Sequence, residues 1–179
     1  LFEARKLMRQ RNYFGPMMVE LNDADSFITG QTVKYSDGVK PLFEILGKEE
    51  HITRVAGMYI MLSKRGPIFF ADTTINEEPT ADDIVKIAKN VAAAVSRINI
   101  KPKIALLSYS NFGSHKGATP KKMNEAANRL REQEPDLVVD GEIQANFALD
   151  NNLLKEVFPF SDLVGNRPNI FIFPDLGAS

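Results

Sequence analysis

The chain has 179 residues, of which 44% are hydrophobic and 25% are charged, a composition typical of a folded globular protein. Its 22 basic residues nearly balance its 23 acidic ones, so no overall positive field favours nucleic acid or an anionic membrane surface. Cysteine is absent, which excludes disulfides and thiolate ligands, and with only His51 and His115 as imidazoles a zinc site is not expected.

No apolar run approaches the roughly 20 residues that a membrane-spanning helix needs, and the start Leu-Phe-Glu-Ala-Arg-Lys carries charges that a signal peptide's apolar segment would not. We therefore expect a cytoplasmic protein without a membrane partner. The first residue is not Met and Ser179 does not follow a clear end to an element, so we interpret the chain as a piece of a longer one.

The first third is expected to contain a helix, a buried strand and a second helix. A modest helical stripe runs through 1–12, the Gly-Pro pair at 15–16 ends it, and the apolar run at 17–19 predicts the strand. The acidic segment 23–30 then suits a helix cap or a ligand site, with capping as the favoured role. A second helix is expected from about Ser36 until Gly47 stops it.

A charged, polar stretch at 48–51 is the best candidate boundary, so we assign residues 1–47 to a first lobe and 48–179 to a second α/β lobe. Within the second lobe, two strand-like runs at 55–62 and 67–71 are joined by Ser-Lys-Arg-Gly, which predicts a β-hairpin. The clearest helix is 80–98, because Thr80 and Asp83 match a capping box and its apolar residues recur at helical spacing.

Residues 103–117 are expected to form a buried strand followed by a polar loop. The run 104–107 is typical of a strand in a parallel sheet covered on both faces, and a loop rich in Ser and Gly follows it. We expect this loop to expose backbone amides, and Thr119 as N-cap with Pro120 at the first helical position to open a helix behind it. That arrangement suits an anion such as phosphate. The alternative is a loop that only turns the chain, since no GxxxxGK[ST] or GxGxxG pattern is present.

Strands and helices alternate to the end of the chain, with a helix expected from 120 to about 133, a strand at 137–139, a turn at 140–142, a mainly helical segment at 146–157 and a last strand at 169–173. This alternation predicts an α/β fold with three α/β/α layers and a largely parallel sheet. The carboxyl ends of three strands would then bring 72–74, 108–114 and 140–144 to one edge, where we expect a cleft for a polar ligand.

No Ser/His/acid triad or GxSxG elbow is present among these residues. For Asp72 and Asp140 individually, capping is favoured over ligand contact. Lys116 is a possible anion partner or an ordinary solvated side chain, and so are Lys34 and Lys40. His115 is a weak acid–base candidate.

Several segments, taken in order, resemble the phosphate acetyltransferase and butyryltransferase family over essentially the whole chain. Residues 23–30 resemble its "DADGLVSG", 39–42 its "VRPAL", 70–72 its "FAD", 76–81 its "NPxPTA", 107–110 its "LSYST", 135–144 its "PDLxxDGxLQ" and 171–176 its "FIFPDL". The resemblance implies the two-lobed fold that phosphotransacetylases share with isocitrate and isopropylmalate dehydrogenases, with a cleft between the lobes and acyl transfer between CoA and phosphate.

Residues 9–19 and 29–36 look more specifically like the C-terminal domain of hybrid NADP-dependent malic enzymes. That domain is thought to have lost acetyl transfer, to bind acetyl-CoA as a regulator and to build the oligomer. The active family holds phosphate with a Ser, a Thr and a later Arg, and the alignment puts Lys34, Tyr35 and Lys40 there. Lys lacks the bidentate fork of Arg, and Tyr fills the space of a small hydroxyl.

The resemblance thus implies a homo-oligomeric domain that binds a CoA ester, with NADP and a divalent metal used only by a malic enzyme portion outside this chain. An active phosphate acyltransferase is the alternative. The family's catalytic residues are expected beyond residue 179. The expected ligand-binding residues are Lys34, Tyr35, Ser36, Lys40, Ser108, Ser110, Ser114, Lys116 and Asp140.

Overall fold

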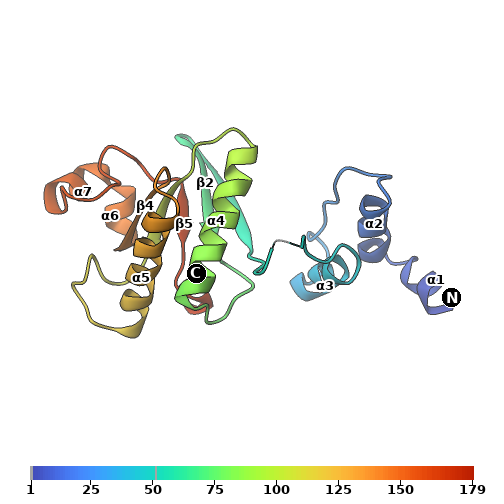
Figure 1. Cartoon of the computed structure of the whole chain (residues 1–179). Helices are drawn as coiled ribbons and strands as arrows, with labels where there is room; N and C mark the ends of the chain where they lie inside the picture. The colour runs from blue at the N-terminus through green and yellow to red at the C-terminus, as the bar shows by residue number, and fades with distance from the viewer. Residues whose placement is uncertain (1, 51) are drawn as a thin grey trace. The chain divides into compact units, whose positions relative to one another are not determined.

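The computed structural model describes residues 2–50 and 52–179, and the chain divides into two compact units, residues 1–52 and 53–179. Figure 1 shows both units and labels all the α-helices and three of the strands, β2, β4 and β5. The assignment of these units to two lobes of one fold, with a boundary after residue 47, stays a prediction. His51 lies outside the described residues.

The first unit contains the helices α1 (Phe2–Leu7), α2 (Arg11–Glu20) and α3 (Tyr35–Ile45), and α2 packs against α3. The expected strand at 17–19 is wrong, because α2 continues through it. Tertiary packing overrides the Gly-Pro break signal: Pro16 is buried, and a side chain at Gly15 would overlap the ring of Phe27. Three apolar residues alone show too little periodicity to distinguish strand from helix.

The other expectations for this unit have mixed outcomes. The acidic segment does not cap a short helix of its own, because residues 21–34 form only turns, bends and irregular backbone. The second expected helix is confirmed as α3. It ends as expected at Gly47, which adopts the left-handed conformation (φ 65°) and donates its N–H to the Leu42 carbonyl at 3.2 Å.

Residues 53–179, all of which the structure describes, form a five-stranded sheet of order β1-β2-β5-β3-β4. The hairpin is confirmed, since β1 and β2 pair antiparallel with Ser63 opposite Gly66, whereas the other neighbouring strands pair in parallel. The strands are β1 (Met58–Ser63), β2 (Gly66–Ala71), β3 (Lys103–Leu107), β4 (Val138–Ile143) and β5 (Ile170–Ile172).

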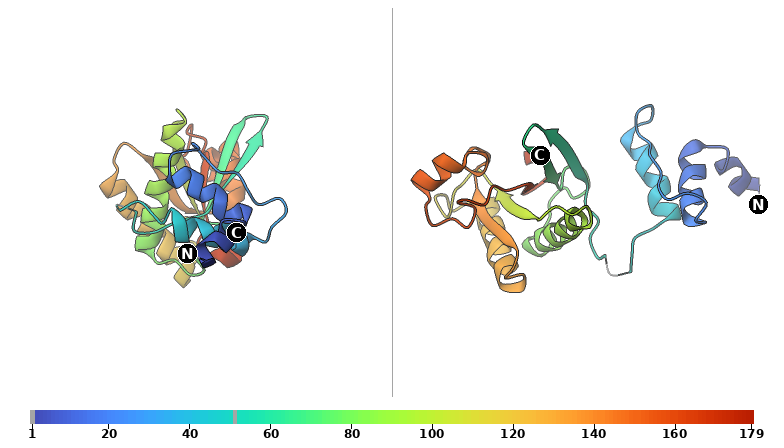
Figure 2. Two further views of the ribbon diagram at one scale, coloured as in Figure 1. Left: turned by 90° about the vertical axis from the view of Figure 1, so that its right-hand side faces the viewer. Right: turned by 90° about the horizontal axis from the view of Figure 1, so that it is seen from above.

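Two long helices, α4 (Ala81–Arg97) and α5 (Ala118–Gln133), lie side by side on one face of the sheet (Figures 1 and 2). The capping box of α4 is confirmed, because Asp83 N–H donates to the Thr80 hydroxyl at 3.2 Å and Thr80 N–H donates to the Asp83 carboxylate at 3.0 Å. None of the described helices is long and apolar enough to cross a bilayer.

The other face is covered by α6 (Ala145–Leu149) and α7 (Asn151–Val157), and the short 3₁₀ helix η1 (Leu176–Ala178) follows β5. The segment 146–157 is mainly helical, as expected. It is divided in two at Asp150, whose carboxylate accepts the N–H groups of Asn152 at 3.0 Å and Leu153 at 3.1 Å and so caps α7.

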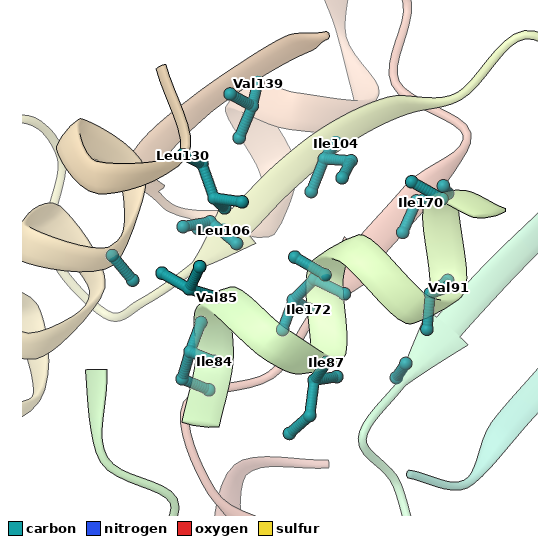
Figure 3. Packing of buried hydrophobic residues seen from close by; sticks show 14 of the residues in the cluster. Ile84, Val85, Ile87, Val91, Ile104, Leu106, Leu130, Val139, Ile170 and Ile172 are labelled. Carbon is teal, nitrogen blue, oxygen red and sulfur yellow. The ribbon is translucent and has the colours of Figure 1, made fainter. Parts of the chain in front are cut away.

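Alternation along β3 and β5 builds a core on each face of the sheet. Ile104 and Leu106 join the α4–α5 side, which Figure 3 shows around α4, whereas Ala105 and Leu107 join the α6–α7 side. In β5, Ile170 joins the α4–α5 side and Phe171 joins the α6–α7 side. Both faces of the parallel strands are thus buried, as the continuous apolar runs predicted, and the three-layer α/β/α fold class is confirmed.

Candidate functional site

The carboxyl ends of β3 and β5 border a pocket of about 360 Å³, which we call the apolar pocket. Parallel α/β sheets bind ligands at this edge, and a mostly apolar wall with a few polar groups suits a small organic molecule. Ser108, an expected ligand contact, is half-buried in this wall. The lining residues are Leu107, Ser108, Tyr109, Thr119, Ala145, Phe173, Pro174, Asp175 and Ala178.

A second pocket of about 700 Å³, the acidic pocket, shares Thr119 and Asp175 with the first. Glu77 and Glu78 also line it, so its field favours cations over phosphate. Its one lysine, Lys122, donates from Nζ to the Pro174 carbonyl at 2.7 Å, which fixes the ammonium group against the protein.

The loop 108–117 uses most of its backbone N–H groups internally. Phe112 donates to the Glu142 carbonyl at 2.9 Å and Gly113 donates to Glu142 Oε1 at 2.6 Å. The N–H groups of residues 108, 110, 111, 114 and 115 also have acceptors, from β4 or from side chains and carbonyls of the loop itself. The expectation that the loop exposes amides to an anion is therefore wrong for residues 108 and 110–115.

The two loop serines that were expected to bind ligand contact each other. Ser110 is buried, and its Oγ lies 3.0 Å from Ser114 Oγ and 3.1 Å from Glu142 Oε1. It also accepts the N–H of His115 at 3.0 Å. Ser114 is exposed and accepts the Asn111 N–H at 3.0 Å. These hydroxyls hold the loop together, and a ligand contact by either stays a prediction.

The helix behind the loop begins earlier than expected. Gly117 is the N-cap of α5, and Thr119 lies in the first turn, so its assignment as N-cap is wrong. A Cβ at Gly117 would overlap the Tyr109 hydroxyl, so a larger residue there would have to displace the Tyr109 side chain. Within the described residues the N–H groups of Ala118 and Thr119 have no acceptor, and both residues line the acidic pocket.

Asp140 lies inside β4 rather than in the turn that was expected at 140–142, and it is buried. Its carboxylate pairs with Arg131 and accepts the Ser161 hydroxyl at 2.6 Å and the Asp162 N–H at 3.0 Å. Asp72 is likewise buried and accepts the N–H groups of Gly57 and Asn76, each at 2.8 Å. Neither caps a helix, so that favoured role is wrong; both tie loops to the sheet.

The residue that sequence reasoning missed is Glu142. A bulge in β4 places Leu106 opposite Gly141 and Leu107 opposite Ile143, so Glu142 has no partner in β3. Gly141 has φ 142°, and a Cβ there would lie 2.6 Å from the Leu106 carbonyl oxygen. Only glycine therefore permits the bulge, which turns the Glu142 carboxylate towards the loop. The Gly-Glu pair at the end of an apolar run was the available signal.

The remaining loop residues are exposed. Lys116 has no ion pair within the described residues, so its role as an anion partner stays a prediction. The ring of His115 meets that of Tyr109 edge-on, with centroids 5.4 Å apart. No group of three or more acidic or imidazole side chains in the described residues could hold a metal ion.

Four expected ligand contacts lie in the first unit, at the beginning of α3. Lys34 is the N-cap residue but makes no side-chain cap, and Tyr35 and Ser36 are the first two residues of the helix. Lys34, Tyr35 and Ser36 are all exposed. Lys40 lies one turn later, and its Nζ is 3.6 Å from Glu44 Oε1. Their contact with a ligand stays a prediction.

A family model described as phosphate acetyl/butaryl transferase matches residues 1–179. The chain belongs to this family. The phosphate acetyltransferase of Corynebacterium glutamicum is 34% identical over 98% of this chain and 53% of its own length. The NADP-dependent malic enzyme of Salmonella typhimurium is also 34% identical over 98% of this chain, but over 23% of its own length.

Solved structures of family members show the same fold. The phosphotransacetylase of Streptococcus pyogenes matches 98% of this chain and 54% of its own with a TM-score of 0.83 and 36% identity. The EutD phosphotransacetylase of Staphylococcus aureus matches the same shares with a TM-score of 0.81 and 30% identity. The chain thus spans from about a quarter to about half of the length of these relatives.

Proposed function

We propose that this chain is the phosphotransacetylase-like domain of a hybrid NADP-dependent malic enzyme, that it binds acetyl-CoA as a regulator, and that its own acyl transfer is lost. In the parent protein, NADP and a divalent metal would serve only the malic enzyme portion, which oxidises and decarboxylates malate to pyruvate. The domain would also take part in a homo-oligomer.

The chemistry at the beginning of α3 carries this proposal. Where the family alignment expects a Ser, a Thr and an Arg for phosphate, this chain has Lys34, Tyr35 and Lys40. Lys40 is a point charge already beside Glu44, which weakens its field on an incoming phosphate. Tyr35 replaces a small hydroxyl with an exposed ring. These substitutions support the loss of phosphate as a substrate.

The apolar pocket supports a CoA ester as the remaining ligand. Its wall is mainly aliphatic and aromatic, with the hydroxyls of Ser108, Tyr109 and Thr119 among these groups. Such a wall suits a thioester or pantetheine arm, which is long, weakly polar and uncharged, better than it suits a phosphate. The N–H groups of Ala118 and Thr119, which have no acceptor among the described residues, could donate to a carbonyl oxygen of the ligand at the neighbouring helix end.

An active phosphate acyltransferase is the second candidate. It is favoured by the phosphate acetyltransferases among the relatives, which are as similar in sequence as the malic enzymes. Under this alternative the loop and pocket would position CoA for transfer of acetyl or butyryl to and from phosphate.

Two assays on the full-length protein separate these functions. The first measures acetyl-CoA formation from acetyl phosphate and CoA, and the second measures malate-dependent NADPH formation with and without acetyl-CoA. We expect no acetyl-CoA formation, and inhibition of NADPH formation by micromolar to millimolar acetyl-CoA. Robust transfer from acetyl phosphate would overturn the regulatory proposal in favour of the acyltransferase.

A further inference from the structure

Glu142 is a buried acid at the centre of the 108–117 loop. Its side chain is 1% exposed, and its Oε1 accepts both the Gly113 N–H and the Ser110 hydroxyl. Its backbone carbonyl holds the N–H of Phe112, which has the unusual φ of 47°. One strand residue therefore fixes three positions of the loop, one of them in a sparsely populated conformation.

The second carboxylate oxygen, Oε2, is buried without a hydrogen-bond partner among the described residues. An unsatisfied buried carboxylate oxygen costs stability, and a side chain chosen for stability alone would not need it. Its presence beside a bulge that only glycine permits indicates a role for this acid in the loop.

A chain of contacts leads from Glu142 to the pocket wall. Ser110, held by Glu142, accepts the N–H of His115, and the His115 ring packs edge-on against Tyr109. Tyr109 lines the apolar pocket and lies over Gly117 at the start of α5. Tyr109 is 57% exposed, and its backbone carbonyl accepts the side-chain N–H of Gln144 at 2.7 Å.

We propose that Glu142 is a positioning residue, which acts through Ser110 and His115 to hold Tyr109 as a wall of the apolar pocket. Tyr109 would touch the ligand and Glu142 would not. The consequence for ligand binding rests on the proposed CoA-ester function, whereas the consequence for the loop does not.

The test uses the full-length protein with Glu142→Ala, Glu142→Gln and Tyr109→Ala. Hydrogen exchange of the peptide covering 108–117 reports the loop, and calorimetric titration with acetyl-CoA reports binding. We expect Glu142→Ala to speed exchange in the loop and to weaken acetyl-CoA binding roughly tenfold. Glu142→Gln retains one acceptor oxygen, so both its loop exchange and its affinity for acetyl-CoA should be close to those of unmodified protein. Tyr109→Ala should weaken binding as much, and the double variant Glu142→Ala/Tyr109→Ala no further.

Ile87→Ala is the matched control, because Ile87 is a fully buried core residue on the other face of the sheet, in a cluster that contains no residue of the loop. It should lower Tm without changing loop exchange or affinity. Unchanged loop exchange in Glu142→Ala, or fully additive losses in the double variant, would overturn the positioning role. If unmodified protein does not bind acetyl-CoA while the loop still responds to Glu142→Ala, the proposed function fails and the control of the loop by Glu142 stands.

Discussion

The phenol of Tyr13 donates a hydrogen bond of 2.6 Å to Oε2 of Glu44 and so joins α2 to α3. The other oxygen of this carboxylate faces Lys40. Glu44 is thereby shared between a helix–helix contact and Lys40, which we expect at the position of the family's phosphate-binding arginine. The hydrogen bond to Glu44, followed by burial and the charge of Glu44, raises the pKa of Tyr13 above its ordinary value.

The raised pKa of Tyr13 predicts that its phenol loses its proton at lower pH in Glu44→Gln. The amide that replaces the carboxylate is neutral, so it would no longer oppose the phenolate charge. Ultraviolet difference titration against Tyr13→Phe isolates this one of the four tyrosines. The same midpoint in Glu44→Gln and unmodified protein would show that the contact does not persist in solution.

Replacing Lys40 with Glu should weaken inhibition of malate turnover by acetyl-CoA and leave turnover without acetyl-CoA nearly unchanged. The change puts like charge near a phosphate of the ligand and also opposes Glu44 one turn away on α3. The measurement is the inhibition constant at low salt, where such contacts count most. Lys6→Glu, which changes charge equally at an exposed position of α1, is the control. Unaltered inhibition would mean that the regulator binds away from Lys40.

The capping box of α4 predicts a loss of stability in acid. Burial alone would raise the pKa of Asp83, but hydrogen bonds from Thr80 and the nearby Arg54 charge outweigh it and lower the pKa below 3.8. A lowered folded-state pKa gives stability that is present above the unfolded value and is lost as pH falls through the folded one. Urea unfolding should therefore show a smaller drop in stability below about pH 4 for Asp83→Asn than for unmodified protein.

Thr80→Ala tests the other half of the capping box at neutral pH. Removal of its hydroxyl leaves the Asp83 N–H without its acceptor, so we expect a loss of about 1 kcal/mol. Ser96→Ala, at the far end of α4, should change the free energy of unfolding by less than about 0.5 kcal/mol. Equal effects of the two substitutions would remove the capping box as a source of stability.

Gly141→Ala should destabilise the protein by about 3 kcal/mol, because it combines a positive φ with a Cβ too close to the Leu106 carbonyl. Gly165→Ala is the matched control: Gly165 also has positive φ (75°), but its Cβ would meet open space. That change should cost only about 1 kcal/mol. Similar losses, measured by urea unfolding, would show that the bulge can relax around a methyl group.

The sequence alone determined the fold class, the hairpin, the capped helix α4 and the family. These features depend on short-range signals: apolar runs, helical spacing and the Thr80–Asp83 pair. It also placed Ser108 at the strand edge where a pocket lies. Local propensity and tertiary packing agree at these places, so the pattern within one segment is enough to predict the structure of that segment.

Tertiary structure determined the features that the sequence pattern could not predict. Packing of Gly15 and Pro16 kept 17–19 helical, and α5 begins after Gly117 instead of after Thr119. The loop whose composition predicts an opening to an anion closes on itself, because the β4 bulge delivers the carboxylate of Glu142 into it. The sequence does not reveal such acceptors, since residues 113 and 142 meet only when two parallel strands pair and one of them gains a residue.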